Sequence, residues 1–344
     1  MNQEENTAPP AVAMILTILV VAIGCEQTTE QVASPEPRVS LTVTNLKTLP
    51  PGEGHYTLWA GFFEFAKAGG AAGTDDEELV SLGDFNIGAD GVPVAPDGGP
   101  VRFRIPGDKD VQLIEGVVVT IGSEALSKST HDEPGSPIMG GVMQGDEKLG
   151  RADLSTKFHD AVGADFSAAE GQYALLAPSS PVRADSSSGV WFVDISTSIS
   201  AGLKGLPVLE GQWIYEGWVV DERSLTPTYY STGTFRRADS ADTDGAGPGK
   251  GPDSGLVFPG QDFITGPLAR PDLSSPGFTF MITIEPVPDN APGPFSFDLL
   301  DSRRPPLLAG AKRSFPDPAP STTAGVMYNQ TPFSRPSGRV TILR

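Results

Sequence analysis

The side chains whose types and spacing come nearest to a metal site are the aspartates of the stretch "DSADTDG". Carboxylate oxygens at alternate loop positions are ligands that Ca²⁺ prefers. The EF-hand template, however, requires Asp where Ser240 stands and a closing Glu where Gly251 stands. We therefore expect a solvated acidic turn without a metal ion. The alternative is a non-standard calcium site built from Asp239, Asp242 and Asp244.

Motifs of catalysis are missing from the sequence. It contains neither a Gly-x-Ser-x-Gly elbow nor a His-Glu-x-x-His pair. The glycine run "DGAGPGKGPDSG" is not a P-loop, because Gly251 follows Lys250 where Ser or Thr is required. The three histidines do not stand at metal-ligand spacing from one another or from the cysteine. We therefore expect no catalytic residues, no enzyme activity and no cofactor.

The charge of the chain also restricts its partners. A net charge of −19 is the wrong sign for a nucleic-acid-binding protein, which replaces counterions with basic side chains. The segment 301–344 differs, with seven Lys or Arg and two Asp. We expect this basic segment to lie across its own acidic domain. The alternative is a contact with anionic lipid or polysaccharide.

Cys25 is the only cysteine and ends an apolar run, "AVAMILTILVVAI", followed by "GC". As a helix these 13 residues span about 20 Å, too short for a hydrocarbon core of about 30 Å. The run is typical of a signal-peptide core. The junction "AIGC" resembles the lipobox of bacterial lipoproteins, although Ala22 replaces the usual Leu and the preceding segment has no Lys or Arg. An ordinary apolar segment that happens to hold a cysteine is the alternative.

The lipobox resemblance implies a signal peptide over residues 1–24 and a lipid on Cys25, which becomes the mature N-terminus. The membrane is then a partner through this lipid, because two or more acyl chains anchor a protein stably. The location implied is the bacterial cell envelope, and Glu26 after the cysteine favours the outer membrane. Residues 25–38 are polar, contain prolines and lack periodicity, so we expect a flexible tether.

Beyond the tether, the hydrophobic pattern has a period of two. Stretches such as "RVSLTV", "VRFRI" and "FTFMITI" alternate apolar and polar residues between Gly, Pro and Asp turns. This pattern is typical of half-buried antiparallel strands. A Pro- and Ser-rich stretch near residue 180 then divides the chain. We expect an all-β fold with two tandem immunoglobulin-like antiparallel β-sandwich domains, residues 39–180 and 189–344.

Four landmarks occur in the same order in both halves, which indicates an internal repeat. They are "NLKTLPPGEGHYTLW" and "GLKGLPVLEGQWIYEGW", "SLGDF" and "STGTF", "VVVTIG" and "FMITIEP", and "DEPGSPI" and "DNAPGPF". This set resembles the extracytoplasmic C-terminal domain of anti-sigma-K factors, over residues 39–154 and 189–300. The resemblance implies a β-sandwich outside the cytoplasm. The sigma-binding domain and membrane-spanning helix of those factors have no counterpart here, so sigma binding is not implied.

Each half carries a Tyr-x-x-Trp pair, Tyr56 with Trp59 and Tyr215 with Trp218. Residues three apart on a strand point to opposite faces, so each Tyr should face the core and each Trp should point away from it. An outward indole is either covered by packing or exposed as a stacking platform for a ligand. The occurrence of two copies favours a packing role, because a duplicated fold needs its packing twice.

These observations lead to one functional expectation and one alternative. We expect a non-catalytic cell-envelope lipoprotein that acts as a binding or structural module, with an unidentified protein or polysaccharide as its ligand and without nucleic acid. The alternative is an extracytoplasmic sensor or regulatory protein related to anti-sigma factors.

Overall fold

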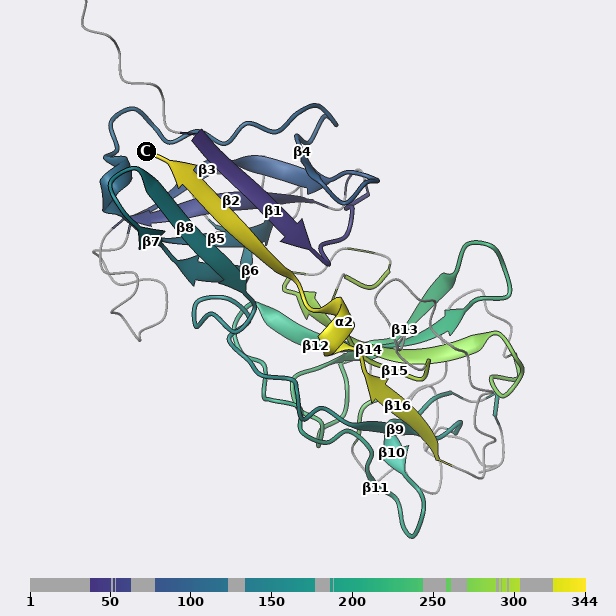
Figure 1. Cartoon of the computed structure of the whole chain (residues 1–344). Coiled ribbons are helices and arrows are strands. Elements are labelled where there is room, and N and C mark those ends of the chain that lie inside the picture. Colours follow the sequence, from purple (N-terminus) through teal and green to yellow (C-terminus); the bar gives the residue numbers. More distant parts are fainter. Residues whose placement is uncertain are drawn as a thin grey trace, which may run out of the picture. The chain divides into compact units, whose positions relative to one another are not determined.

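Figure 1 shows the protein as a computed structural model. The described residues are 38–50, 52, 54–62, 78–122, 134–176, 186–187, 189–243, 258–260, 271–288, 291, 293–295, 297–303 and 324–344. The signal peptide, Cys25 and most of the tether lie outside them. Two compact units divide the chain, Met1–Glu36 and Pro37–Arg344, and the fold described below belongs to the second.

The described residues form antiparallel β-sheets, which confirms the all-β expectation. The first sheet has nine strands in the order β1-β17-β8-β6-β5-β2-β3-β4, with β7 paired to β8. Its strands are β1 (Arg38–Thr44), β2 (His55–Phe62), β3 (Glu78–Ile87), β4 (Pro93–Val94), β5 (Ile114–Gly122), β6 (Ser136–Val142), β7 (Gln144–Gly145), β8 (Leu149–Ser155) and β17 (Ser337–Leu343).

The second sheet has six strands in the order β13-β12-β14-β15-β16-β9. Its strands are β9 (Gly171–Tyr173), β12 (Trp213–Asp221), β13 (Thr228–Phe235), β14 (Phe278–Pro286), β15 (Phe297–Asp301) and β16 (Gly325–Asn329). The remaining elements are the pair β10 (Val193–Asp194) and β11 (Ser200–Ala201), the 3-10 turn η1 (Val111–Leu113) and the short helix α2 (Thr331–Ser334).

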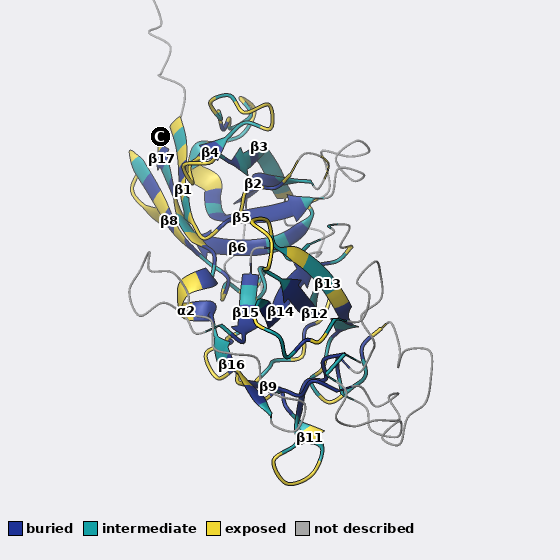
Figure 2. Ribbon diagram, turned by 90° about the vertical axis from the view of Figure 1, so that its right-hand side faces the viewer, coloured by how far each residue is buried: buried dark blue, intermediate teal, exposed yellow. Residues whose placement is uncertain are grey.

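Along β1, β8 and β17 of the first sheet, buried residues alternate with exposed ones, whereas β2 and β5 are buried on both faces, as Figure 2 shows by colour. On β17, Val340 and Ile342 are fully buried, whereas Arg339, which precedes Val340, is exposed. The edge strands β1 and β4 approach each other, so the sheet curls around its apolar face. This curl covers the apolar inner faces of β1, β8 and β17, which have polar residues on their other faces.

The C-terminal strand crosses the expected domain boundary. β17 lies between β1 and β8 and pairs with both along its whole length, from Ser337 to Leu343. Conversely, β9, which precedes the expected boundary in the sequence, pairs with β16 of the second sheet. The division into residues 39–180 and 189–344 therefore does not follow the sheets. A Pro- and Ser-rich stretch suggested that division, but strand pairing joins the end of the chain to its first strand (Figure 1).

Side chains of the two sheets also pack against one another. A single cluster of buried apolar side chains includes residues from both sheets, such as Tyr56 and Tyr215. The indole Nε1 of Trp213 donates to the Pro137 carbonyl at 3.1 Å. Lys47 Nζ donates to the Pro294 carbonyl at 2.9 Å. The halves are thus joined by buried apolar area as well as by the chain.

The repeated landmarks occupy matching positions in the two sheets. The strand order β3-β2-β5-β6 of the first matches β13-β12-β14-β15 of the second. Register shifts occur at Leu58/Trp59 and at Glu216/Trp218. Opposite them stand Gly83 and Gly233, with φ of 143° and 97°. Glycine adopts these left-handed values without steric cost, which explains why both "SLGDF" and "STGTF" contain it.

The buried place of β17 gives a stability prediction. Ile342→Ala should lower the free energy of unfolding by about 2–5 kcal/mol, because it leaves a cavity in the core of the first sheet. The matched control is Thr341→Ala, whose side chain lies on the outer face, and it should change this free energy by less than about 0.5 kcal/mol. Urea denaturation of the full chain measures both. Equal stability of the two variants would show that β17 is not inserted in the sheet.

Candidate functional site

The tyrosines of both Tyr-x-x-Trp pairs lie on the inner faces and are fully buried. The Tyr56 hydroxyl donates to the Lys47 carbonyl at 3.0 Å, and the Tyr215 hydroxyl donates to the Pro207 carbonyl at 2.6 Å. Burial raises the pKa of the Tyr215 phenol. Each hydroxyl thus satisfies a carbonyl of the preceding "LKTLP" or "LKGLP" loop. This role is structural, because a neutral donor inside a core fixes the loop.

The tryptophans lie on the opposite faces of the same strands, as the spacing predicts. Trp59 is 4 % exposed and Trp218 is 2 % exposed, so neither indole offers a stacking surface. Trp59 Nε1 donates to Thr120 Oγ1 at 2.9 Å, and Trp218 Nε1 donates to Thr283 Oγ1 at 2.8 Å. The Tyr229 ring packs edge-on against Trp218. Both indoles are therefore covered, and a ligand site must be sought elsewhere.

Truncation of a covered indole should be costly. We expect Trp218→Ala to lower the free energy of unfolding by about 3–5 kcal/mol, the usual loss for a buried large aromatic side chain. Phe333→Ala is the control, since Phe333 is 37 % exposed and its loss should leave stability within about 0.5 kcal/mol. Thermal and urea denaturation measure both variants. A Trp218→Ala protein as stable as its parent would contradict the packing role and make this strand a candidate ligand surface.

The aspartates of the acidic loop have separate partners. Asp239 forms an ion pair with Arg237, with Nε and Oδ1 at 3.0 Å. Asp242 is 8 % exposed and accepts from the Gly260 backbone nitrogen at 2.7 Å. Asp244 lies outside the described residues. Within the described ranges, no three His, Cys, Asp or Glu side chains gather as they would around a metal ion.

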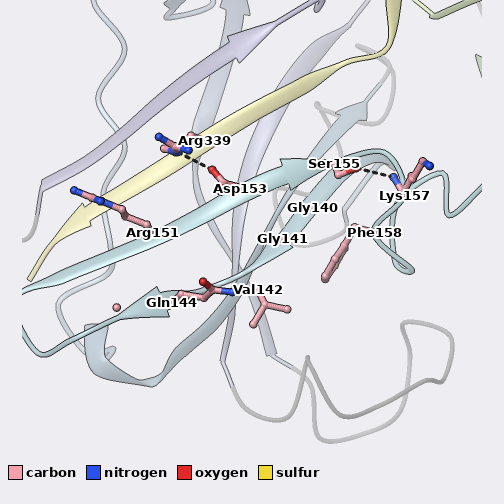
Figure 3. A pocket seen from close by; sticks show the side chains of 11 residues that line it. Gly140, Gly141, Val142, Gln144, Arg151, Asp153, Ser155, Lys157, Phe158 and Arg339 are labelled. Atoms are coloured by element: carbon pink, nitrogen blue, oxygen red, sulfur yellow. Dashed lines mark hydrogen bonds and ion pairs between the residues drawn. The ribbon is translucent and has the colours of Figure 1, made fainter. Parts of the chain in front are cut away.

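A groove of about 710 Å³ lies on the outer face of the first sheet, where β6, β7, β8 and β17 meet. Figure 3 shows its lining, with two arginines at one end and a lysine and a phenylalanine at the other. The lining residues are Gly140, Gly141, Val142, Gln144, Gly145, Arg151, Asp153, Ser155, Lys157, Phe158 and Arg339.

The groove arises because β6 and β8 diverge. They pair at a single position, Gly140 opposite Ser155, and β7 then takes over the pairing with β8. The floor is made of glycines without side chains. A Cβ at Gly140 would collide with the Phe158 ring, and a Cβ at Gly141 would collide with the Asp153 carbonyl. The glycines are therefore required because the Phe158 ring and the β8 backbone pack directly against them.

The charged groups of the groove come from neighbouring strands. Arg339 Nε on β17 lies 2.6 Å from Asp153 Oδ1 on β8, and this carboxylate raises the pKa of Arg339. Lys157 Nζ lies 2.7 Å from Asp165 Oδ2. The Arg151 side chain is exposed and, in the part of the chain that the structure describes, its guanidinium has no hydrogen-bond or ion-pair partner. The groove thus presents three cationic groups and one carboxylate on a chain of net charge −19.

The side chains of the groove can bind anions and hydroxyl groups. Guanidinium and ammonium groups hold carboxylates or phosphates, and Gln144 and Ser155 add groups that bond hydroxyls. Sequence reasoning marked the basic segment that contains Arg339 but did not single out the groove. The signal that could have found it is "MGGVMQG", since paired glycines inside an apolar strand mark a close backbone approach.

No protein-family model, curated protein or solved structure matches this chain. In the described part of the chain, no helix has the length and apolar character needed to cross a bilayer.

The ion pair at one end of the groove gives a pH prediction. The hydrogen bond from Lys157 lowers the pKa of Asp165 to about 2. Because this pKa is lower in the folded state than in the unfolded chain, the pair stabilises the fold above about pH 4 and ceases to do so as pH falls toward 2. Asp165→Asn should therefore reduce the urea midpoint at pH 6 and have a smaller effect at pH 2.5. A difference between variant and parent that stays constant with pH would contradict this assignment.

Proposed function

We propose that the protein is a non-catalytic bacterial cell-envelope lipoprotein, anchored through a lipid on Cys25 after removal of residues 1–24. It acts as a binding module outside the cytoplasm, and its ligand is a polysaccharide or protein of the envelope. Its two halves are tandem immunoglobulin-like β-sandwich units that share a core and are joined by β17. The outer membrane is the proposed location.

The observation that supports binding best is the groove with Arg151 exposed above a glycine floor. In the described part of the chain the exposed Arg151 guanidinium has no side-chain partner, so it is open to a ligand, whereas the neighbouring Arg339 and Lys157 each pair with a carboxylate. The burial of the two indoles also supports the groove as the ligand surface. Because Trp59 and Trp218 are committed to packing, the groove is the better candidate for a ligand surface.

The alternative, an extracytoplasmic sensor related to anti-sigma factors, remains a proposal of a different class. Its support is the set of landmarks shared by the two halves. The hydrogen bonds of Tyr56 and Tyr215 give those landmarks a packing role in this protein. The landmarks thus favour a common fold unit and do not identify a sensory partner.

Lipid attachment can be tested directly. Expressed in a bacterial host with labelled palmitate, the full chain should incorporate label and fractionate with membranes. Cys25→Ser should lose both the label and the processing of residues 1–24, because the thiol is the acylated group. A control substitution outside the junction, Ser34→Ala, should leave labelling unchanged. Equal labelling of the Cys25→Ser protein would exclude the lipoprotein assignment.

A further inference from the structure

We propose that the outer-face groove binds an acidic polysaccharide, a chain of sugars that bear carboxylates, with Arg151 as the main anion-binding residue. This inference rests on the proposed envelope function and adds the chemical class of the ligand. It is carried by the placement of the arginines, by the shape of the groove and by its position on the face of a sheet.

The arginines form a diagonal pair across two strands. Arg339 stands opposite Asp153, and Thr341 stands opposite Arg151, so the two arginines are diagonal neighbours on the outer face. Diagonal neighbours are within reach of long side chains. Asp153 holds Arg339 in place, which leaves Arg151 to receive a carboxylate in a bidentate pair. Lys157 at the far end gives a second point of contact along the same groove (Figure 3).

The rest of the lining suits sugar hydroxyls. Gln144 is exposed and offers both donors and an acceptor, and Ser155 offers a hydroxyl. The half-buried Phe158 ring forms one wall.

The position of the groove argues against an extended peptide. Peptides that add to sheets bind at an edge, where unpaired backbone groups supply hydrogen bonds. This groove instead lies over β8, which pairs with β17 on one side and with β7 on the other. Side chains must therefore supply the contacts, as they do for hydroxylated and charged sugars.

The charge of the whole protein argues against a lipid surface. An anionic bilayer would face a broad area of a molecule with net charge −19, so long-range repulsion would oppose docking. A single polysaccharide chain enters the groove without bringing a wide anionic surface close to the acidic remainder. Local attraction by Arg151 then acts over a few ångströms, where salt screens it least, while Arg339 and Lys157 remain paired with Asp153 and Asp165.

The test is affinity electrophoresis of the full chain in detergent, through gels that contain polygalacturonate or its fully methyl-esterified form. The two polymers differ in the carboxylate charge and share the sugar backbone. We expect retardation by polygalacturonate and little by the ester. Arg151→Gln should weaken the retardation about tenfold or more, as for the loss of a charge-assisted hydrogen bond. Arg102→Gln, an exposed arginine outside the groove, removes the same charge and should bind like the parent.

A second variant tests the shape independently of charge. Gln144→Trp places a bulky side chain in the groove without altering net charge, and it should also abolish retardation while urea denaturation shows an unchanged midpoint. Equal retardation by acid and ester, or equal weakening by Arg102→Gln and Arg151→Gln, would overturn the carboxylate site. Binding to phosphatidylglycerol vesicles instead, lost in Arg151→Gln, would assign the groove to lipid. Absence of polygalacturonate binding would refute this ligand class, whereas the lipoprotein proposal depends on the palmitate result.

Discussion

The insertion of β17 between β1 and β8 is the constraint on which the rest of the structure depends. β1 ends the first sheet and has β17 as its one strand partner in the pairing order. The pairing joins Arg38 to Leu343, so it closes a loop of almost the whole described chain. Closing such a loop costs conformational entropy that local contacts do not repay, and the buried Val340 and Ile342 supply part of the compensation. The first sheet cannot be completed before the C-terminus is present.

The second sheet has no strand inserted at the corresponding place, although its pairing is also long-range, from Tyr173 to Gly325. There β9 pairs directly with β16, whereas in the first sheet β17 separates β8 from β1. The central order β3-β2-β5-β6 of the first sheet thus matches β13-β12-β14-β15 of the second. The two sheets differ beyond β6 and β15, where only the first contains the inserted β17. The features repeated in both sheets serve packing: a tyrosine hydroxyl donates to a loop carbonyl, and an indole nitrogen donates to a threonine hydroxyl. Such buried donors need their acceptors in place, which fixes the register of the strands in each half.

The sequence predicted those features that depend on short-range pattern. Period-two alternation predicted strands such as β1 and β14, and the spacing of Tyr56 and Trp59 predicted their opposite faces. The prediction was wrong for "VRFRI", because residues 101–105 form no regular strand. The partner of each strand could not be predicted, because alternation defines a face and leaves the neighbour open. The strand "RVTIL" near the C-terminus alternates equally well for either sheet, so its place beside β1 was missed. The groove was missed for the same reason, since Arg151 and Arg339 are almost two hundred positions apart and meet only through strand pairing.

The candidate site therefore depends on the same long-range strand pairing, of β17 with β8 and β1, as the fold does. Arg339 reaches the groove on β17, while Arg151 and Asp153 reach it on β8. Without the insertion of β17, Asp153 would lose the guanidinium 2.6 Å away, and the groove would keep one arginine beside an uncompensated carboxylate. An anionic ligand would then meet repulsion where it now meets a paired acid. Binding at this surface and completion of the first sheet are thus physically coupled, because a single strand provides both a buried apolar face and an exposed basic one.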